Sequence, residues 1–369
     1  MKLHLIFIGN KFIYNSALQE YVLRSIKNRN EFIDSITYFR SSDNSLFLHI
    51  EDQINSDASI IIVTTKQNFS TIGKLISTVT SDNQVLKDGM LMPNKVSLFQ
   101  ERSYLLKHNK AVVNVLQIDE DEGMPQILLQ TKKTRETIHV FEEEKESLIS
   151  ILAPIAQTHE VTFDVTKKVE GWLRIDISSN RYGDISNFIQ GVQKLLPKKL
   201  IATSNILLHI IEKLTLAHKK VSFAESCTGG LLSYYFTKNN GASNILDGSL
   251  VTYSNALKEN WLAVSHTTLK EFGAVSSEVV YEMSDGAMDV SSADYTLSIS
   301  GIAGDGGGTE EKPVGTVFIS ARSKENHKEE HLKFYGDRNY VQQQSALYAI
   351  KMLLLVDKKT FFEISLKNT

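Results

Sequence analysis

Apolar runs alternate with segments of helical periodicity along the first part of the chain. The runs at 3–8, 58–63 and 111–115 are mostly apolar, which is typical of strands buried on both faces. Segments 17–26 and 46–54 repeat their apolar residues with helical spacing. This alternation predicts a mainly parallel sheet covered by helices.

A smaller pattern follows in the middle of the chain. Segments 161–165 and 172–177 alternate with a period of two and predict a pair of strands, and 185–196 predicts an amphipathic helix. We expect the preceding helix to stop at Pro154, and we place a domain boundary there. The predicted domains are an α/β domain at 1–154, a small α+β linker domain at 155–201 and a C-terminal domain at 202–369.

The last region again alternates strand and helix patterns. A helix is predicted at 206–217, and strands are predicted to end near Phe223, Tyr253 and Ser300. We expect this region to form a three-layer α/β/α domain, and the whole chain to be of the α/β class. In such sheets ligands bind at the carboxyl ends of the strands.

Composition gives no indication of a polyanionic partner. The chain has 369 residues with 40 basic and 43 acidic side chains, and its formal charge is -3. Because this balance gives no electrostatic attraction for polyanions, we expect neither a nucleic-acid nor a membrane partner. The single cysteine, Cys227, allows no intrachain disulfide and favours a reducing compartment, so a cytoplasmic protein is expected. The apolar start of the chain is too short for a membrane span and is interpreted as a strand.

Residues 224–230, Ala-Glu-Ser-Cys-Thr-Gly-Gly, place a hydroxyl at a predicted strand-to-helix junction beside two glycines. Backbone N–H groups at a helix start lack helical partners, and together with the helix dipole they can hold a phosphate or an oxyanion. Ser226 is therefore a candidate nucleophile. The alternative is an ordinary N-cap serine with packing glycines, and the heptapeptide alone leaves both interpretations open.

Tyr253 and Lys258 follow the next predicted strand and are expected at the same sheet edge as Ser226. A lysine beside a serine acts as a general base when burial keeps it neutral, and a tyrosine hydroxyl can relay the proton. A surface lysine and a strand-end aromatic are the alternatives.

Further segments are predicted to end at this edge. Ser276 is a capping candidate, 301–308 is a glycine-rich loop, and Arg338 opens the last long helix, where it could bind a phosphate or pair with an acidic side chain. The H-x-x-E-H pattern at 327–331 would bind zinc on a helix, but its surroundings predict a strand, so no metal site is expected.

These motifs, in this order and spacing, resemble the C-terminal domain of the CinA family, the bacterial nicotinamide mononucleotide (NMN) deamidases. The resemblance spans about 204–356 and implies hydrolysis of NMN to nicotinate mononucleotide and ammonia, without a metal or cofactor. It implies that Ser226 is the nucleophile, Lys258 its general base and Tyr253 a proton relay. A homodimer is the expected assembly. The segments that carry the resemblance are 224–230, 251–254 with Lys258, 273–276, 300–304, 313–317 and 336–338. The implied substrate-binding residues are Thr228, Gly229, Gly230, Ser276, Gly301, Ala303, Gly304 and Arg338.

The N-terminal region resembles the molybdopterin-binding-like half of the same family, but it departs from the family pattern. The family carries a Thr-Gly-Gly-Leu-Gly-Pro-Thr loop after the buried strand, whereas residues 63–70 read Val-Thr-Thr-Lys-Gln-Asn-Phe-Ser. We therefore expect a scaffold or oligomerisation role there. A second departure is Gln342, where relatives often carry arginine.

Two other interpretations remain beside the NMN amidase. One is a binding or regulatory protein of the competence or DNA-damage response that keeps the fold without turnover. The other makes Cys227 the nucleophile, although no histidine lies in the neighbouring motifs to activate it.

Overall fold

The computed structural model describes residues 2–29, 32–130, 135–179, 182–291, 293–304 and 306–363. It divides into two compact units, Met1–Lys133 and Thr134–Thr369, which are described separately. Among the described residues, no helix has the length and apolar character needed to cross a membrane. The predicted α/β class is confirmed.

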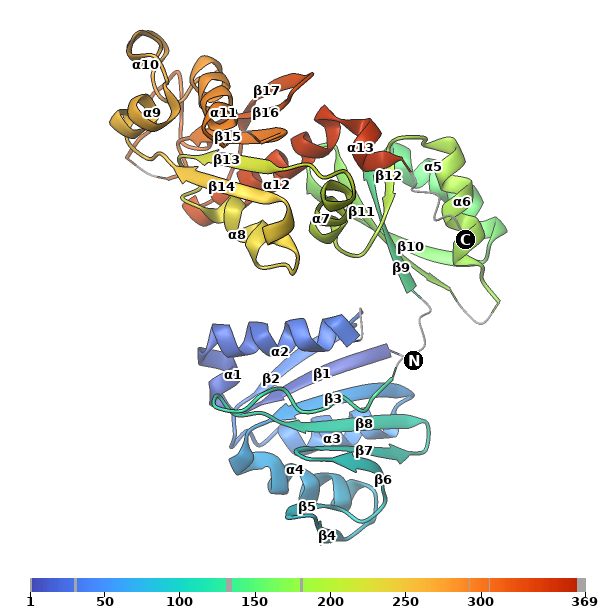
Figure 1. Cartoon of the computed structure of the whole chain (residues 1–369). Coiled ribbons are helices and arrows are strands. Elements are labelled where there is room, and N and C mark those ends of the chain that lie inside the picture. Colours follow the sequence, from blue (N-terminus) through green and yellow to red (C-terminus); the bar gives the residue numbers. More distant parts are fainter. Residues whose placement is uncertain are drawn as a thin grey trace. The chain divides into compact units, whose positions relative to one another are not determined.

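The first unit is built on a six-stranded sheet of order β2-β1-β3-β8-β7-β6 (Figure 1). Strands β2, β1, β3 and β8 run parallel, as predicted, whereas β7 and β6 add an antiparallel extension. The sheet is therefore mixed, because short turns such as that at 109–110 join neighbouring strands directly. The strands are β1 (Lys2–Ile8), β2 (Ser35–Phe39), β3 (Ala58–Thr64), β6 (Val96–Gln100), β7 (Ser103–His108) and β8 (Ala111–Gln117), with a separate hairpin β4 (Gln84–Lys87) and β5 (Met90–Pro93).

Helices cover both faces of this sheet. One core cluster joins the sheet to α3 (Leu46–Asn55) and α4 (Lys66–Val79), and the other joins it to α1 (Asn10–Tyr14) and α2 (Ser16–Arg29). Only Thr65 separates β3 from α4, so a glycine-rich phosphate loop is absent at this described junction.

The second unit begins with a four-stranded sheet of order β10-β11-β9-β12. The predicted strand pair is confirmed: β10 (Val161–Val169) and β11 (Trp172–Ser179) are antiparallel, and β9 (Arg135–Phe141) and β12 (Leu200–Ala202) extend the sheet. Helices α5 (Lys145–Thr158) and α6 (Ile185–Leu195) pack on one face of this four-stranded sheet and share a hydrophobic core with it.

The predicted helix stop at Pro154 is wrong, because α5 continues through it to Thr158. An internal proline removes one helical hydrogen bond, but Leu148, Leu152 and Ala156 form a buried stripe that continues across it. The predicted boundary after residue 154 consequently falls inside a helix. The small sheet starts earlier, at β9.

The small sheet and the C-terminal region share a hydrophobic core. The other face of the sheet contributes Phe141, Val169, Trp172 and Ile201 to the cluster that also fills the C-terminal region. The indole of Trp172 is 1% exposed and stacks on Phe141 with ring centroids 5.5 Å apart. This shared core accounts for the single compact unit.

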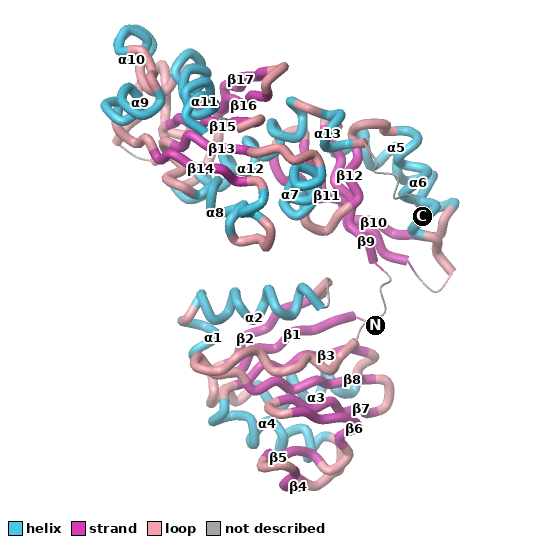
Figure 2. Tube along the Cα trace, viewed as in Figure 1, coloured by secondary structure: helices cyan, strands magenta, loops and turns pink. Residues whose placement is uncertain are grey.

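The C-terminal region is a three-layer structure around a five-stranded sheet of order β14-β13-β15-β16-β17 (Figure 2). Strands β14, β13 and β15 are parallel, and β16 and β17 form an antiparallel extension. The strands are β13 (Val221–Glu225), β14 (Leu246–Val251), β15 (Tyr295–Gly301), β16 (Thr316–Ser323) and β17 (His327–Lys333).

Two groups of helices cover this sheet on opposite faces. Helices α9 (Asn255–Leu262), α10 (His266–Phe272) and α11 (Ser277–Ser291) lie on one face, where α11 approaches α9 so closely that a Cβ at Gly286 would lie 1.9 Å from the Leu262 carbonyl oxygen. The helices of the other face are α7 (Ile206–Leu216), α8 (Leu231–Thr237), α12 (Arg338–Val356) and α13 (Lys358–Phe362), and a short 3-10 helix (Ala242–Asn244) follows α8.

Candidate functional site

Ser226 lies directly after β13, at the carboxyl edge of the parallel strands. Glu225 is in register with Val251 on β14 and with Ile299 on β15, so β13 and β14 end side by side and β15 continues two residues further. The Ser226 N–H donates to the Ile299 carbonyl at 2.9 Å, and its side chain is 8% exposed. The predicted common edge is therefore present in the structure.

Lys258 reaches Ser226 from the first turn of α9. Its Nζ lies 3.0 Å from Ser226 Oγ, 2.7 Å from the Thr252 carbonyl oxygen and 3.4 Å from the Tyr253 carbonyl oxygen. The lysine is 1% exposed, and Ser254 caps its helix by accepting from the Leu257 N–H. The structure thus brings together the predicted nucleophile and base.

Burial lowers the pKa of Lys258 to about 8, from an ordinary value of 10.5. A neutral amine has two N–H donors and one lone pair. The two backbone carbonyls can only accept, so they take the N–H groups and leave the lone pair for the Ser226 hydroxyl. This arrangement suits a general base for Ser226.

Glu225 is a functional residue that the sequence-based prediction missed. Its carboxylate is fully buried and accepts from the backbone N–H groups at the start of α8 and from the Ser249 hydroxyl, at 2.9–3.3 Å. The N–H donors belong to Gly230, Leu232 and Ser233. An acidic residue that ends an apolar strand directly before a glycine-rich helix start was the available clue.

The position of Glu225 corrects the predicted anion site. We expected the orphan N–H groups of the helix after Ser226 to hold an oxyanion, but Glu225 already occupies them. Within the loop itself, the Gly229 N–H donates to the Ser226 carbonyl. Among the described residues, the Thr228 N–H and the buried Thr228 hydroxyl have no recorded hydrogen-bond partner.

Cys227 points away from this chemistry. Its side chain is 4% exposed and belongs to the hydrophobic core on the α12 face of the sheet. Burial raises the pKa of its thiol to about 12, which disfavours the thiolate that a cysteine nucleophile needs. Its carbonyl oxygen accepts a hydrogen bond from Gln342 Nε2 at 2.7 Å.

Tyr253 and Arg338 lie near the loop with exposed side chains. Tyr253 contributes its backbone carbonyl to Lys258, while its side chain is 61% exposed, so its role as a proton relay stays a prediction. Arg338 lies against Gly304, where an added Cβ would come within 2.9 Å of its Nε. Its charge contributes to lowering the pKa of the Cys227 thiol, against the larger effect of burial.

Of the remaining predicted binding residues, three have structural contacts and two are glycines of the Ser226–Gly230 loop. Ser276 caps α11: its hydroxyl donates to the Gly273 carbonyl and accepts from the Val279 N–H, so its geometry is that of a structural cap. Gly301 and Ala303 are packed, the first against Val317 of β16 and the second in the core. Gly229 has a φ of 59° and open space around its Cα, whereas Gly230 is the left-handed N-cap of α8. Asp305 of the glycine-rich loop lies outside the described residues.

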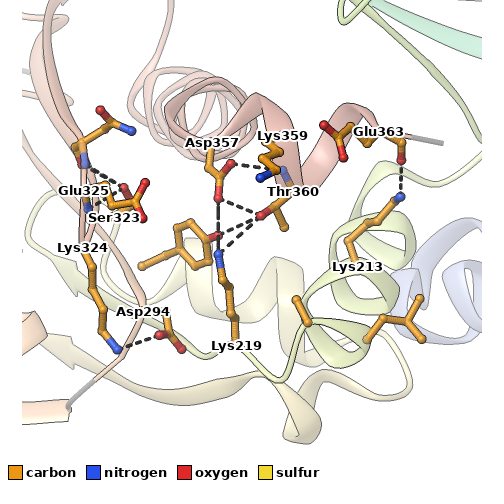
Figure 3. A pocket seen from close by; sticks show the side chains of 14 residues that line it. Lys213, Lys219, Asp294, Ser323, Lys324, Glu325, Asp357, Lys359, Thr360 and Glu363 are labelled. Carbon is orange, nitrogen blue, oxygen red and sulfur yellow. Dashed lines mark hydrogen bonds and ion pairs between the residues drawn. The ribbon is translucent and has the colours of Figure 1, made fainter. Parts of the chain in front are cut away.

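A cavity of about 600 Å³ lies at the opposite end of the sheet, beside the start of β15 (Figure 3). There the Lys219 ammonium bonds Tyr295, Asp357 and Thr360, and Lys324 pairs with Asp294. These charged groups are paired with one another. Because the Lys219 contacts join Tyr295 of β15 to Asp357 and Thr360 at the start of α13, we attribute to them the attachment of α13 to the sheet.

The two histidines of the H-x-x-E-H pattern lie on strand β17, as predicted. The His331 ring stacks on Phe318 with centroids 4.3 Å apart, and the edge of His327 contacts Tyr281 at 5.4 Å. Both rings therefore have packing partners.

Residues 204–356 match the family model described as the CinA C-terminal domain. A CinA-like protein of Thermosipho melanesiensis is 42% identical over 171 residues, which are 45% of this chain and 43% of the relative. A CinA-like protein of Prochlorococcus marinus is 36% identical over 220 residues, which are 56% of this chain and 50% of the relative. The chain spans about half the length of these relatives or less.

Solved structures are also similar to the C-terminal part. One is the competence/damage inducible protein CihA from Agrobacterium tumefaciens, at 36% identity with a TM-score of 0.40, covering 41% of this chain and 93% of that chain. Another is a CinA superfamily protein from Enterobacter cloacae, at 32% identity with a TM-score of 0.40. That match covers 41% of this chain and 89% of the Enterobacter chain.

Proposed function

Since the chain belongs to the CinA family, we propose that it is a nicotinamide-nucleotide amidase that hydrolyses NMN to nicotinate mononucleotide and ammonia. The observation that carries the proposal is the contact between Ser226 Oγ and the buried amine of Lys258, at 3.0 Å. A buried lysine with a pKa near 8, held on a serine hydroxyl, is costly for stability and suits amide hydrolysis.

In the first step, Lys258 takes the Ser226 hydroxyl proton while Oγ bonds to the carboxamide carbon. The carbonyl π electrons move to oxygen and give a tetrahedral oxyanion. The N–H groups at the start of α8 are occupied by Glu225, so the donors left for this oxyanion belong to the Ser226–Gly230 loop: the N–H groups of Cys227 and Thr228 and the Thr228 hydroxyl.

In the second step, the protonated Lys258 returns its proton to the amide nitrogen, the C–N bond breaks and ammonia leaves. Tyr253 is the proposed relay for this proton. Its backbone carbonyl binds the Lys258 amine, and its side chain is exposed. Water then adds to the acyl-Ser226 carbon while Lys258 takes its proton. The new oxyanion re-forms the carbonyl as the Oγ–C bond breaks, Lys258 returns the proton to Ser226 Oγ, and the released acid ionises to the carboxylate.

Arg338 is the proposed contact for the phosphate of the nucleotide. Its side chain is exposed, and no ion pair or hydrogen bond of its own is recorded within the described parts of the chain. Gly304 leaves room for the guanidinium beside the loop after β15, and a guanidinium binds phosphate with two parallel hydrogen bonds.

Purified protein incubated with NMN tests the proposal, with nicotinate mononucleotide and ammonia measured together. We expect the two products in equal amounts. If NMN is bound but neither product forms, the protein is a binding or regulatory member of the competence or damage response, and the amidase proposal is wrong.

A further inference from the structure

Gln342 holds the peptide group between Cys227 and Thr228. Its Nε2 donates to the Cys227 carbonyl oxygen at 2.7 Å, from the second turn of α12. The peptide bonds of the described residues are all trans, and in a trans peptide the C=O and the following N–H point in opposite directions. By fixing the Cys227 carbonyl toward α12, Gln342 therefore directs the Thr228 N–H away from that helix.

Three other N–H donors of the same loop already have partners. The Ser226 N–H bonds Ile299, the Gly229 N–H bonds Ser226, and the Gly230 N–H bonds Glu225. The N–H groups of Cys227 and Thr228 are left without a recorded acceptor in the described part of this loop, and the Thr228 N–H is the one that belongs to the peptide group held by Gln342. A nucleophile of this kind needs an N–H donor close by for the oxyanion, and Thr228 is two residues from Ser226.

Thr228 supplies a second, independent observation. Its side chain is 3% exposed, and its hydroxyl is a buried group without a partner among the described residues. Leaving such a group buried and unpaired is unfavourable. A substrate oxygen that accepts from both the N–H and the hydroxyl of Thr228 would satisfy them.

We propose that Gln342 is a positioning residue, which acts through the Cys227 carbonyl to aim the Thr228 N–H at the carboxamide oxygen of the substrate. The proposal rests on the amidase function and adds an oxyanion donor and the device that orients it. Gln342 lies one helical turn after Arg338 and on the same face of α12. One helix would thus orient the oxyanion donor with Gln342 and bind the phosphate with Arg338.

A matched set of variants separates this role from a merely structural one. Gln342→Met keeps the size of the side chain but removes the donor, and Gln342→Arg keeps a donor. Gln343→Met makes the same change at the next, exposed position of α12. Thermal unfolding of each variant monitors folding.

The first measurement is the rate at which 4-nitrophenyl acetate acylates Ser226, followed by peptide mass mapping, with Ser226→Ala as the blank. This activated ester needs the nucleophile and the oxyanion donor but no recognition of a nucleotide. We expect Gln342→Met to lower the rate by about tenfold to hundredfold, less than the roughly 10²–10³ for complete loss of an oxyanion donor. Gln342→Arg and Gln343→Met should stay near the wild type.

The second measurement is turnover of NMN by the same proteins. A fall in kcat with little change in KM is expected for Gln342→Met. If the wild type does not hydrolyse NMN but its Ser226 acylation still depends on a donor at position 342, the amidase function is wrong and the positioning role stands. Equal acylation rates in Gln342→Met and wild type, or no acylation of Ser226 at all, would overturn the positioning role.

Discussion

At the scale of single residues, the site combines one reactive pair with a buried carboxylate. Lys258 and Ser226 are both shielded from solvent, and burial of the lysine lowers its pKa to about 8. The Glu225 carboxylate accepts from the N–H groups at the start of α8. The amine can therefore be neutral at a pH where an exposed lysine would be charged.

The pKa of Lys258 predicts how activity depends on pH. Only the neutral amine accepts the Ser226 proton, so kcat/KM for NMN should rise with pH and level off above about 8. Lys258→Met should reduce kcat by about 10²–10⁴ and abolish this rise. A flat profile in the wild type between pH 6 and 9, measured by ammonia release, would contradict the assignment of the base.

The same residue predicts a change in stability with pH. Between about 8 and 10.5 the unfolded chain holds the Lys258 proton and the folded chain does not, so the wild type gains stability as pH rises. Below this window the cost of burying the ammonium is fully present. The free energy of unfolding of Lys258→Met relative to wild type, from urea titrations, should therefore fall across the window.

At this scale the sequence predicts the residues whose chemistry is visible in a motif. Ser226 and Lys258 were found because each follows a strand that ends at the same sheet edge. The roles of Glu225 and Gln342 depend on contacts with backbone groups of α8 and of the loop, and no pattern of residue types specifies those contacts.

At the scale of elements, the start of α8 depends on Glu225. A helix of seven residues has little intrinsic stability, and three of its orphan N–H groups bond one buried carboxylate. This bond network ties the end of β13 to α8. It also closes the Ser226–Gly230 loop between them.

Glu225→Gln tests that network. The amide nitrogen cannot accept, so at least one N–H of α8 loses its partner, and we expect a loss of about 1–3 kcal/mol in the free energy of unfolding. Asp337→Asn is the matched control at the exposed cap of α12, where asparagine also caps well and the change should be small. Equal effects of the two substitutions in chemical denaturation would contradict the proposed importance of Glu225.

Most elements could be predicted from hydrophobic periodicity, and the errors have physical causes. Strand β15 is buried although its residues alternate between apolar and hydroxyl side chains. The hydroxyls of Thr296, Ser298 and Ser300 donate to backbone carbonyls of α11 and its preceding loop, so burial leaves them paired. Pro154 was misinterpreted because the packing of α5 outweighs the lost hydrogen bond. The hairpins between α4 and β8 were missed, since β4 and β6 are short, partly exposed strands without strong alternation.

At the scale of the whole molecule, the candidate site lies within one of two compact units. The predicted boundary at 154 was misplaced because the small sheet shares its core with the C-terminal region, and a shared core leaves no linker composition to find in the sequence. The first unit lacks a glycine-rich loop after β3 in its described part. Its role as a scaffold or in oligomerisation stays a prediction.

Truncation tests this division. We expect residues 134–369 alone to hydrolyse NMN with the kcat of the full chain, because Ser226, Lys258 and Arg338 all belong to that unit. A shorter fragment, 204–369, should unfold at a lower temperature, since it loses Phe141 and Trp172 from the shared core. Identical unfolding midpoints for the two fragments would contradict the shared core, and an inactive but folded 134–369 would give the first unit a part in catalysis.

The central claim is that Ser226, rather than the adjacent Cys227, attacks the carboxamide of NMN. Ammonia release from NMN by wild type, Ser226→Ala and Cys227→Ala tests it most directly. The account predicts that Ser226→Ala loses turnover and that Cys227→Ala, which removes a buried thiol with a pKa near 12, keeps it. Turnover retained in Ser226→Ala and lost in a folded Cys227→Ala would contradict the account.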